Sequence, residues 1–240
     1  MAPPVVACLH HLDTAFTGHA GRAMRAAGVE LDERHVVDGD PLPALDEVDG
    51  LLTLGGDQSV RDIASLPVLE AEAALLRDAV EARVPVFGVC LGAQLLAHAL
   101  GGSVRRLPRR MVTWAPIEPL AAATGDPVTG SLPAGAMALH WNEDGFEPPP
   151  GAVELLRRTS GGAEAFRFAD SAWGVQFHPE VDPEALEGWY EVGERELSEA
   201  AVAETDARAL DAVHLPGQVP LAEALFGGFA RVVAARTVHA

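Results

Sequence analysis

Apolar runs that alternate with helix-like segments constrain the fold of this chain more than any other feature. Such short apolar runs are typical of strands buried on both faces of a sheet. The strands expected in the first half are Val5–Leu9, Arg34–Val37, Asp49–Leu54 and Val84–Val89. Helical patterns lie between and after them, at Gly18–Gly28, Leu66–Arg83 and Leu91–Leu100. This alternation predicts an α/β fold with a mostly parallel central sheet and helices on both faces.

The second half of the chain has a different pattern, in which short strand-like runs are separated by turn residues. These runs lie at Val112–Leu120, Ala136–Trp141, Val153–Arg158, Ala163–Phe168 and Trp173–Phe177. Some of them are expected to pair antiparallel. Two further segments, Pro183–Val213 and Leu221–Arg236, are predicted to be helical. We expect one α/β domain over residues 1–190 and a helical C-terminal extension over residues 191–240, packed on the same domain.

Composition and charge exclude several classes of protein. The 240 residues are 48% hydrophobic, which is ordinary for a globular chain, and the net charge of −18 disfavours binding to nucleic acid or to anionic membranes. No apolar run reaches the roughly 18 residues that span a bilayer, and the N-terminus shows no secretory signal. These features predict a cytoplasmic protein, in which Cys8 and Cys90 are not expected to form a disulfide.

Cys90 stands in a pattern typical of an enzyme nucleophile. An apolar strand leads into Gly88-Val89-Cys90-Leu91-Gly92 and then into a helix. Flanking glycines permit a strained turn that exposes the sulfur, and the helix N-terminus favours the thiolate. The backbone N–H of Leu91 is then placed to stabilise an oxyanion. Cys8 lies in an apolar strand without such glycines, so we interpret it as a buried core residue.

A cysteine nucleophile needs a base and a group that orients the base. His178 follows the apolar run Trp173–Phe177 and precedes Pro179 and Glu180. It is therefore expected at a strand end, where catalytic side chains of α/β sheets collect. Glu180 is near enough in sequence to hold the imidazole in one tautomer, although a solvated His and Glu in a loop is also open on these residues alone.

Three motifs together resemble those of the class I (triad) glutamine amidotransferase family. They are Gly-Val-Cys-Leu-Gly-Ala-Gln at 88–94, His-Pro-Glu at 178–180, and Gly-Gly-Asp-Gln-Ser-Val at 55–60, which is similar to the family's G-G-P-x-S loop. The resemblance covers about residues 1–190 and is greatest to free-standing members similar to the amidotransferase domain of GMP synthase. It implies a flavodoxin-like α/β domain.

The resemblance also implies roles for individual residues. Cys90 attacks the carboxamide of glutamine, His178 moves the proton and Glu180 orients His178. Backbone N–H groups at Gly56 and Leu91 form the oxyanion hole. Gln94 is expected on the substrate side of the elbow. No metal and no organic cofactor is implied for this reaction.

A second segment, His140–Phe146, resembles a substrate-side sequence that often reads H-W-H-G-D-x-F in free-standing members. By this resemblance His140 and Asp144 are substrate-binding residues, and Asp144 accepts from the α-ammonium group; a polar turn is the open alternative. The chain departs from the family at Asp57, where proline is usual, and at Asn142 and Glu143, where His-Gly is usual. The first change is expected to loosen the oxyanion loop, and the second leaves the substrate open.

These observations predict an enzyme that hydrolyses L-glutamine through a cysteine thioester and passes ammonia to a separate partner synthetase. No G-x-x-x-x-G-K-[ST] loop for ATP is present. Two alternatives stay open. One is a hydrolase of another γ-glutamyl amide or peptide with the same mechanism, and the other is a catalytically quiet regulatory or binding subunit. Self-association as a homo-oligomer and the role of the C-terminal extension are also left open.

Overall fold

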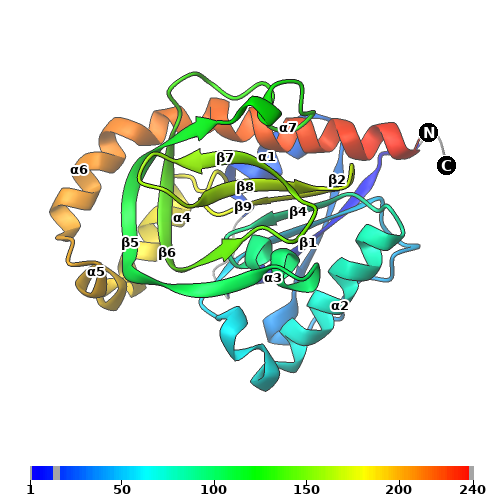
Figure 1. The fold of residues 1–240 in the computed structure, drawn as a ribbon, viewed down its shortest axis with the longest axis horizontal. Coiled ribbons are helices and arrows are strands. Elements are labelled where there is room, and N and C mark those ends of the chain that lie inside the picture. The colour runs from blue at the N-terminus through cyan, green and yellow to red at the C-terminus, as the bar shows by residue number, and fades with distance from the viewer. Residues whose placement is uncertain (1, 13–16, 238–240) are drawn as a thin grey trace.

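The structure, a computed structural model, describes residues 2–12 and 17–237, and these residues contain one nine-stranded sheet (Figure 1). Its strand order is β2-β1-β3-β4-β9-β8-β7-β5-β6. The strands are β1 (Val5–His11), β2 (Glu30–His35), β3 (Gly50–Gly56), β4 (Val86–Val89), β5 (Ser103–Pro119), β6 (Met137–Glu147), β7 (Val153–Arg158), β8 (Ala163–Phe168) and β9 (Ala172–Val175). The neighbouring strands β2, β1, β3, β4 and β9 pair in parallel, whereas β9, β8, β7, β5 and β6 pair antiparallel.

Helices cover both faces of this sheet, as the alternation of strands and helices predicts. They are α1 (Gly18–Ala26), α2 (Pro67–Glu81), α3 (Leu91–Ala99), α4 (Pro183–Val192), α5 (Glu194–Ala200), α6 (Glu204–His214) and α7 (Gln218–Thr237), with short 3-10 turns at Val36–Asp38, Val60–Ser65, Ala121–Ala123 and Leu215–Gly217. Helices α1 and α7 lie on one face and α2 and α3 on the other, while α4 to α6 pack beside β5 and β6 (Figure 1). None of the helices described is both long and apolar enough to cross a membrane.

Helix α7 belongs to the main core although it follows residue 190. Its buried residues include Leu225, Phe226 and Phe229, which recur at helical spacing and form one apolar stripe. The ring of Phe87 in β4 lies 5.2 Å from that of Phe226 and 5.5 Å from that of Phe229. The final helix therefore closes the core over the central parallel strands.

Three strands differ from the sequence prediction by more than two residues, and one of them, expected at Ala136–Trp141, is β6, which extends to Glu147. The strand expected at Arg34–Val37 is β2, Glu30–His35, which ends where the carboxylate of Asp40 accepts from the backbone N–H of His35. β2 is a half-exposed edge strand, so its polar sequence lacks the apolar run that marks a buried strand. The strand expected at Val112–Leu120 begins at Ser103, because the arginine-rich segment before Val112 pairs with β6 at the end of the sheet.

The helical segment predicted at Pro183–Val213 is divided into α4, α5 and α6. Helix α4 ends at Val192, before Gly193, and α5 ends at Ala200, before Ala201, whose φ of 50° lies in the left-handed region. The helical pattern of the sequence predicted the content correctly but not these two breaks, since neither is marked by proline.

The carboxyl ends of four adjacent parallel strands form one edge of the sheet. β1 ends at His11, opposite Gly56 at the end of β3. β4 leads directly to Cys90, whose N–H donates to the carbonyl oxygen of Val175, the last residue of β9. In open α/β sheets ligands bind outside the carboxyl ends of strands, so this edge is where a functional site is expected.

Candidate active site

Cys90 joins β4 to α3 with φ 51° and ψ −106°, a conformation that side-chain-bearing residues rarely adopt. A Cβ added at Gly92 would lie 2.2 Å from the carbonyl oxygen of Thr53, and one at Gly88 would lie 2.7 Å from the amide nitrogen of Ala93. Both glycines are therefore needed for the close packing of β3, β4 and α3. The result is the strand–turn–helix elbow that the sequence predicts, with Cys90 at the N-terminus of α3.

His178 is held on several sides. Its Nδ1 lies 2.7 Å from a carboxylate oxygen of Glu180, so the imidazole is oriented as the sequence predicts. Its backbone N–H donates to the carbonyl oxygen of Leu139, and its carbonyl oxygen accepts from the side chain of Gln218 in α7 at 2.7 Å. The ring of Trp189 packs against the imidazole, with 4.8 Å between centroids. No local signal predicts Gln218, because it lies 40 residues along the chain.

The environment of His178 favours the imidazolium form. Burial alone would lower the pKa of this side chain, but the negative charges of Glu180 and Cys90 outweigh burial and raise the pKa to about 10. The Nε2 atom is buried and makes no hydrogen bond to any part of the chain described. One ring nitrogen is thus bound to a carboxylate while the other is available for proton transfer.

The loop after β3 lies beside the elbow. A Cβ added at Gly56 would lie 2.9 Å from a side-chain carbon of Leu91 and 2.5 Å from the Cβ of His11. The two residues predicted to supply oxyanion N–H groups, Gly56 and Leu91, are therefore neighbours. Asp57, at the position where the family usually has proline, is exposed at the cavity.

A buried hydrogen-bond network lies next to this loop. Nε2 of His11 lies 2.7 Å from one carboxylate oxygen of Glu72 in α2, and the hydroxyl of Thr53 donates to the other at 2.5 Å. Burial alone would lower the pKa of His11, but the charge and hydrogen bond of Glu72 raise it. Sequence reasoning missed this network, since its members lie in three different elements and carry no local motif.

Gln94 and Asp144 both lie at the cavity, as predicted. The side-chain nitrogen of Gln94 donates to the carbonyl oxygen of Asp144 and to the side-chain oxygen of Gln176, each at 3.2 Å. The carboxylate of Asp144 accepts from the hydroxyl of Ser59 at 2.6 Å and from the guanidinium of Arg61 at 3.0 Å. Asp144 is therefore an ion-paired carboxylate before any substrate arrives.

His140 does not lie where a substrate-binding residue is expected. It is fully buried, its Nε2 lies 2.8 Å from a carboxylate oxygen of Glu164, and its Nδ1 lies 3.1 Å from the carbonyl oxygen of Ala138. It does not line the cavity, whereas Trp141 and Asn142 do. The expectation that His140 binds substrate is therefore wrong, because its side chain faces the core and not the cavity.

A cavity of about 660 Å³ brings the other predicted residues together. Those that line it are Gly56, Cys90, Leu91, Gln94, Asp144, His178 and Glu180. Sequence reasoning gave no role to several more of its residues, namely His11, Arg110, Trp141, Trp189, Arg195 and Glu196. Glu143 at its rim binds three arginines, Arg61, Arg106 and Arg110. The cavity therefore combines the predicted site residues with charged and aromatic side chains.

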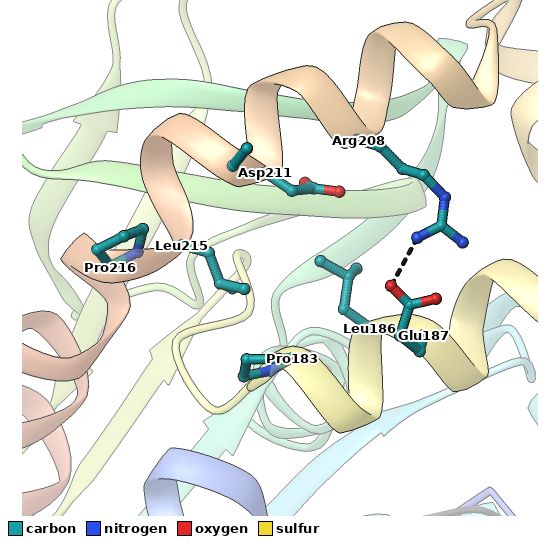
Figure 2. Close-up of a pocket in the computed structure, with 8 residues that line it drawn as sticks. Pro183, Leu186, Glu187, Arg208, Asp211, Leu215 and Pro216 are labelled. Carbon is teal, nitrogen blue, oxygen red and sulfur yellow. Dashed lines mark hydrogen bonds and ion pairs between the residues drawn. The ribbon is translucent and has the colours of Figure 1, made fainter.

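A second, smaller cavity of about 300 Å³ lies between α4 and α6, away from Cys90 (Figure 2). Arg208 from α6 binds Glu187 from α4 across it at 2.6 Å. The buried carboxylate of Asp211 accepts from the indole of Trp114 at 2.7 Å and from the hydroxyl of Tyr190 at 2.5 Å. Because Arg208, Glu187 and Asp211 already have polar partners, we interpret this cavity as a packing feature between α4 and α6.

Comparison with known proteins agrees with this arrangement. The family model of glutamine amidotransferase class-I matches residues 13–188. The chain belongs to this family. The family in general consists of cysteine-dependent amidohydrolases. A solved glutamine amidotransferase from Thermotoga maritima, 24% identical, has the same fold with a TM-score of 0.81 over 99% of each chain.

Three relatives indicate the range of this family around the chain. The glutamine amidotransferase-like protein YfeJ of Salmonella typhimurium is 30% identical over 72% of this chain and 74% of its own length. One GMP synthase [glutamine-hydrolyzing] subunit of Haloarcula marismortui is 32% identical over 69% of this chain and 80% of its own length. The gamma-glutamyl-L-1-hydroxyisopropylamide hydrolase of a Pseudomonas species is 27% identical over 80% of this chain and 64% of its own length. Of the longer GMP synthases that it also matches, the chain spans 21–26% of the length.

Proposed function

We propose that this protein hydrolyses the side-chain amide of L-glutamine to glutamate and ammonia, with Cys90 as the nucleophile. The observation that carries the proposal is the position of Cys90 at a strained elbow on the same cavity as His178, whose other ring nitrogen binds Glu180. A nucleophile, a base and an orienting carboxylate at one cavity are what cysteine-dependent acyl transfer requires.

The proposed reaction has two stages. The Cys90 thiolate attacks the amide carbon, and the oxyanion of the tetrahedral intermediate is stabilised by the N–H groups of Gly56 and Leu91. Imidazolium at His178 gives its Nε2 proton to the leaving nitrogen, so ammonia departs and a γ-glutamyl thioester remains. Neutral His178 then takes a proton from water, which attacks the thioester and releases glutamate. Glu180 holds the imidazole through both stages.

Substrate binding is assigned to the opposite side of the cavity. We propose that the α-ammonium group of the substrate meets Asp144, since a carboxylate has lone pairs beyond those that Ser59 and Arg61 occupy. Gln94 fixes the backbone of Asp144 through its carbonyl oxygen. No metal or organic cofactor takes part in the proposed reaction, and His140 is left out of it.

Ammonia is proposed to pass to a separate synthetase in the cytoplasm. The support is the match with the Haloarcula marismortui protein, which is named as one subunit of a glutamine-hydrolysing GMP synthase, over 80% of its length. A synthetase partner would bind this chain at the cavity mouth. Co-purification from cells that express a tagged chain, followed by assay of the captured synthetase with glutamine, tests this part of the proposal.

A second candidate is hydrolysis of a larger γ-glutamyl amide or peptide by the same mechanism. Two observations favour it: the cavity of about 660 Å³ exceeds what glutamine fills, and a γ-glutamyl amide hydrolase is among the relatives. Competition between glutamine and a panel of γ-glutamyl amides separates the candidates. A kcat/KM for any amide well above that for glutamine would favour the second.

The test of the leading proposal is glutamate release from L-glutamine by the purified protein beside Cys90→Ala. Release that disappears in the variant is expected. Release by neither protein, from glutamine or from any γ-glutamyl amide, would favour the third candidate, a catalytically quiet regulatory subunit that keeps the fold.

A further inference from the structure

Gln176 places a buried amide next to the sulfur of Cys90. It follows β9 directly and precedes Phe177 and His178, and its backbone N–H donates to the carbonyl oxygen of Glu164 in β8 at 2.9 Å. The side chain is 3% exposed, and its nitrogen lies 3.6 Å from Sγ of Cys90. The sulfur of Cys90 thus has a buried hydrogen-bond donor beside it.

The orientation of this amide is fixed by a chain of hydrogen bonds. The carbonyl oxygen of Asp144 can only accept, and it accepts from the nitrogen of Gln94 at 3.2 Å and from that of Asn142 at 2.8 Å. Because Gln94 presents its nitrogen here, the same nitrogen faces Gln176 and requires the side-chain oxygen of Gln176 as its acceptor. The NH₂ group of Gln176 must then face the sulfur.

We propose that Gln176 is a catalytic residue whose side-chain N–H stabilises the thiolate of Cys90 and holds it in its attacking position. The inference rests on the proposed role of Cys90 as nucleophile. A hydrogen bond to an ionised acceptor is about twice as strong as one to a neutral acceptor, so this donor favours the thiolate over the thiol. Burial strengthens the effect, since water does not compete at this side of the sulfur.

The same donor acts at two points of the reaction. Before attack it stabilises the free thiolate. When the second tetrahedral intermediate collapses, the C–S bond breaks and its electron pair remains on sulfur, where the Gln176 N–H is again in place. Loss of the donor is therefore expected to slow both formation and release of the thioester, which lowers kcat more than it raises KM.

The test is the pH dependence of alkylation of Cys90 by iodoacetamide, followed by mass spectrometry of the intact protein. In Gln176→Met the amide is replaced by a side chain of similar length without a donor. We expect the alkylation midpoint to rise by about one pH unit, as loss of a hydrogen bond to a charged group implies. In Gln94→Leu the amide of Gln176 is free to rotate, so a smaller rise is expected.

Two controls accompany these variants. Cys90→Ala should show no alkylation, since burial raises the pKa of the Cys8 thiol well above its ordinary range. Phe166→Leu removes volume behind Gly174 in β9 without touching the sulfur, so it should lower stability and leave the alkylation midpoint unchanged. This control separates loss of the donor from general loosening of the strand.

An unchanged midpoint in folded Gln176→Met would overturn the inference, whatever the protein does with glutamine. Should Gln176→Met fail to fold, Gln94→Leu decides: a raised midpoint supports the inference and an unchanged one contradicts it. Because alkylation needs no turnover, the readouts separate the two proposals. If the midpoint shifts in Gln176→Met but the wild type does not hydrolyse glutamine, the role of Gln176 is supported and the proposed substrate is refuted. If the midpoint does not shift but glutamine hydrolysis depends on Cys90, the proposed function is supported and the role of Gln176 is refuted.

Discussion

Two buried histidine–glutamate pairs in this protein have nearly the same geometry and different surroundings. In one, Nδ1 of His178 lies 2.7 Å from Glu180, and in the other, Nε2 of His140 lies 2.8 Å from Glu164. The second nitrogen of His178 has no hydrogen-bond partner in the described chain, whereas that of His140 meets the carbonyl oxygen of Ala138. A carboxylate partner therefore does not distinguish these two histidines; of the two, His178 alone lines the cavity and keeps a ring nitrogen without a hydrogen bond.

A third buried pair, formed by His11 and Glu72, shares these features with the pair of His178. His11 lines the cavity, as His178 does; its Nε2 is bound by Glu72, and its Nδ1, like Nε2 of His178, is buried without a hydrogen bond in the described chain. Its Cβ packs where a side chain on Gly56 would be. We interpret this pair as a support for the oxyanion loop rather than as a base.

The largest effect is expected from His178→Asn. Loss of the base should lower kcat/KM for glutamine by about 10⁴-fold, as removal of a triad member does in other enzymes. Stability should fall by less than in His140→Leu, since the asparagine can still donate a hydrogen bond to Glu180. Steady-state glutamate release measures the effect. Activity within ten-fold of the wild type would show that the available nitrogen of His178 is not what distinguishes the two pairs.

His140→Leu should have the opposite profile. Loss of the hydrogen bond from His140 costs about 3 kcal/mol, because one buried carboxylate oxygen of Glu164 is left unpaired while Arg158 stays 3.4 Å from the other. Urea unfolding should therefore shift strongly, while kcat/KM of the folded fraction stays within about two-fold of the wild type. The double variant with Glu164→Leu should recover part of the stability. A loss of kcat/KM as large as that of His178→Asn would restore His140 to the site.

Gln218→Met tests how α7 holds His178. The change removes the donor to the carbonyl oxygen of His178 and keeps the size of the side chain. We expect kcat to fall by about ten-fold, the lower range for residues that orient a catalytic group. Phe226→Leu, also in α7 but distant from that carbonyl, is the matched control and should change stability alone. Equal kcat losses in both variants would mean that α7 acts only through packing.

The smallest effect concerns pH. The pKa of His178 is raised to about 10, so its protonated form stabilises the fold fully below about pH 6.5 and this contribution disappears as pH rises through about 10. We expect the Tm to fall by on the order of 5 °C across that window. In Glu180→Gln, which removes the main charge that raises this pKa, the fall should be smaller. Identical pH profiles would argue against a charged His178–Glu180 pair.

Local sequence predicted the parts of the site that local backbone geometry determines. Cys90 could be placed because its elbow requires glycine on both sides, and His178 with Glu180 because both follow one apolar strand. The parallel strands were predictable for a similar reason, since strands buried on both faces are apolar throughout.

Features that depend on contacts between distant segments were not predictable in this way. The motif around His140 resembles a substrate-side segment, but the direction of a side chain follows from its register in β6 against β5, which a motif does not fix. Gln218 reaches His178 from α7 through one hydrogen bond, and Gln176, although it is close to His178 in sequence, contacts Cys90, which lies 86 residues away. The arginine-rich start of β5 lacks an apolar pattern because it pairs at the end of the sheet.

The most direct test of the central claim is detection of the covalent intermediate. The protein is mixed with L-glutamine, quenched in acid within the first turnovers and analysed by peptide mass spectrometry. The peptide containing Cys90 should gain the mass of one γ-glutamyl group, and the adduct should be absent in Cys90→Ala. Release of glutamate without an adduct at Cys90, or undiminished release by Cys90→Ala, would contradict the role of Cys90 as nucleophile.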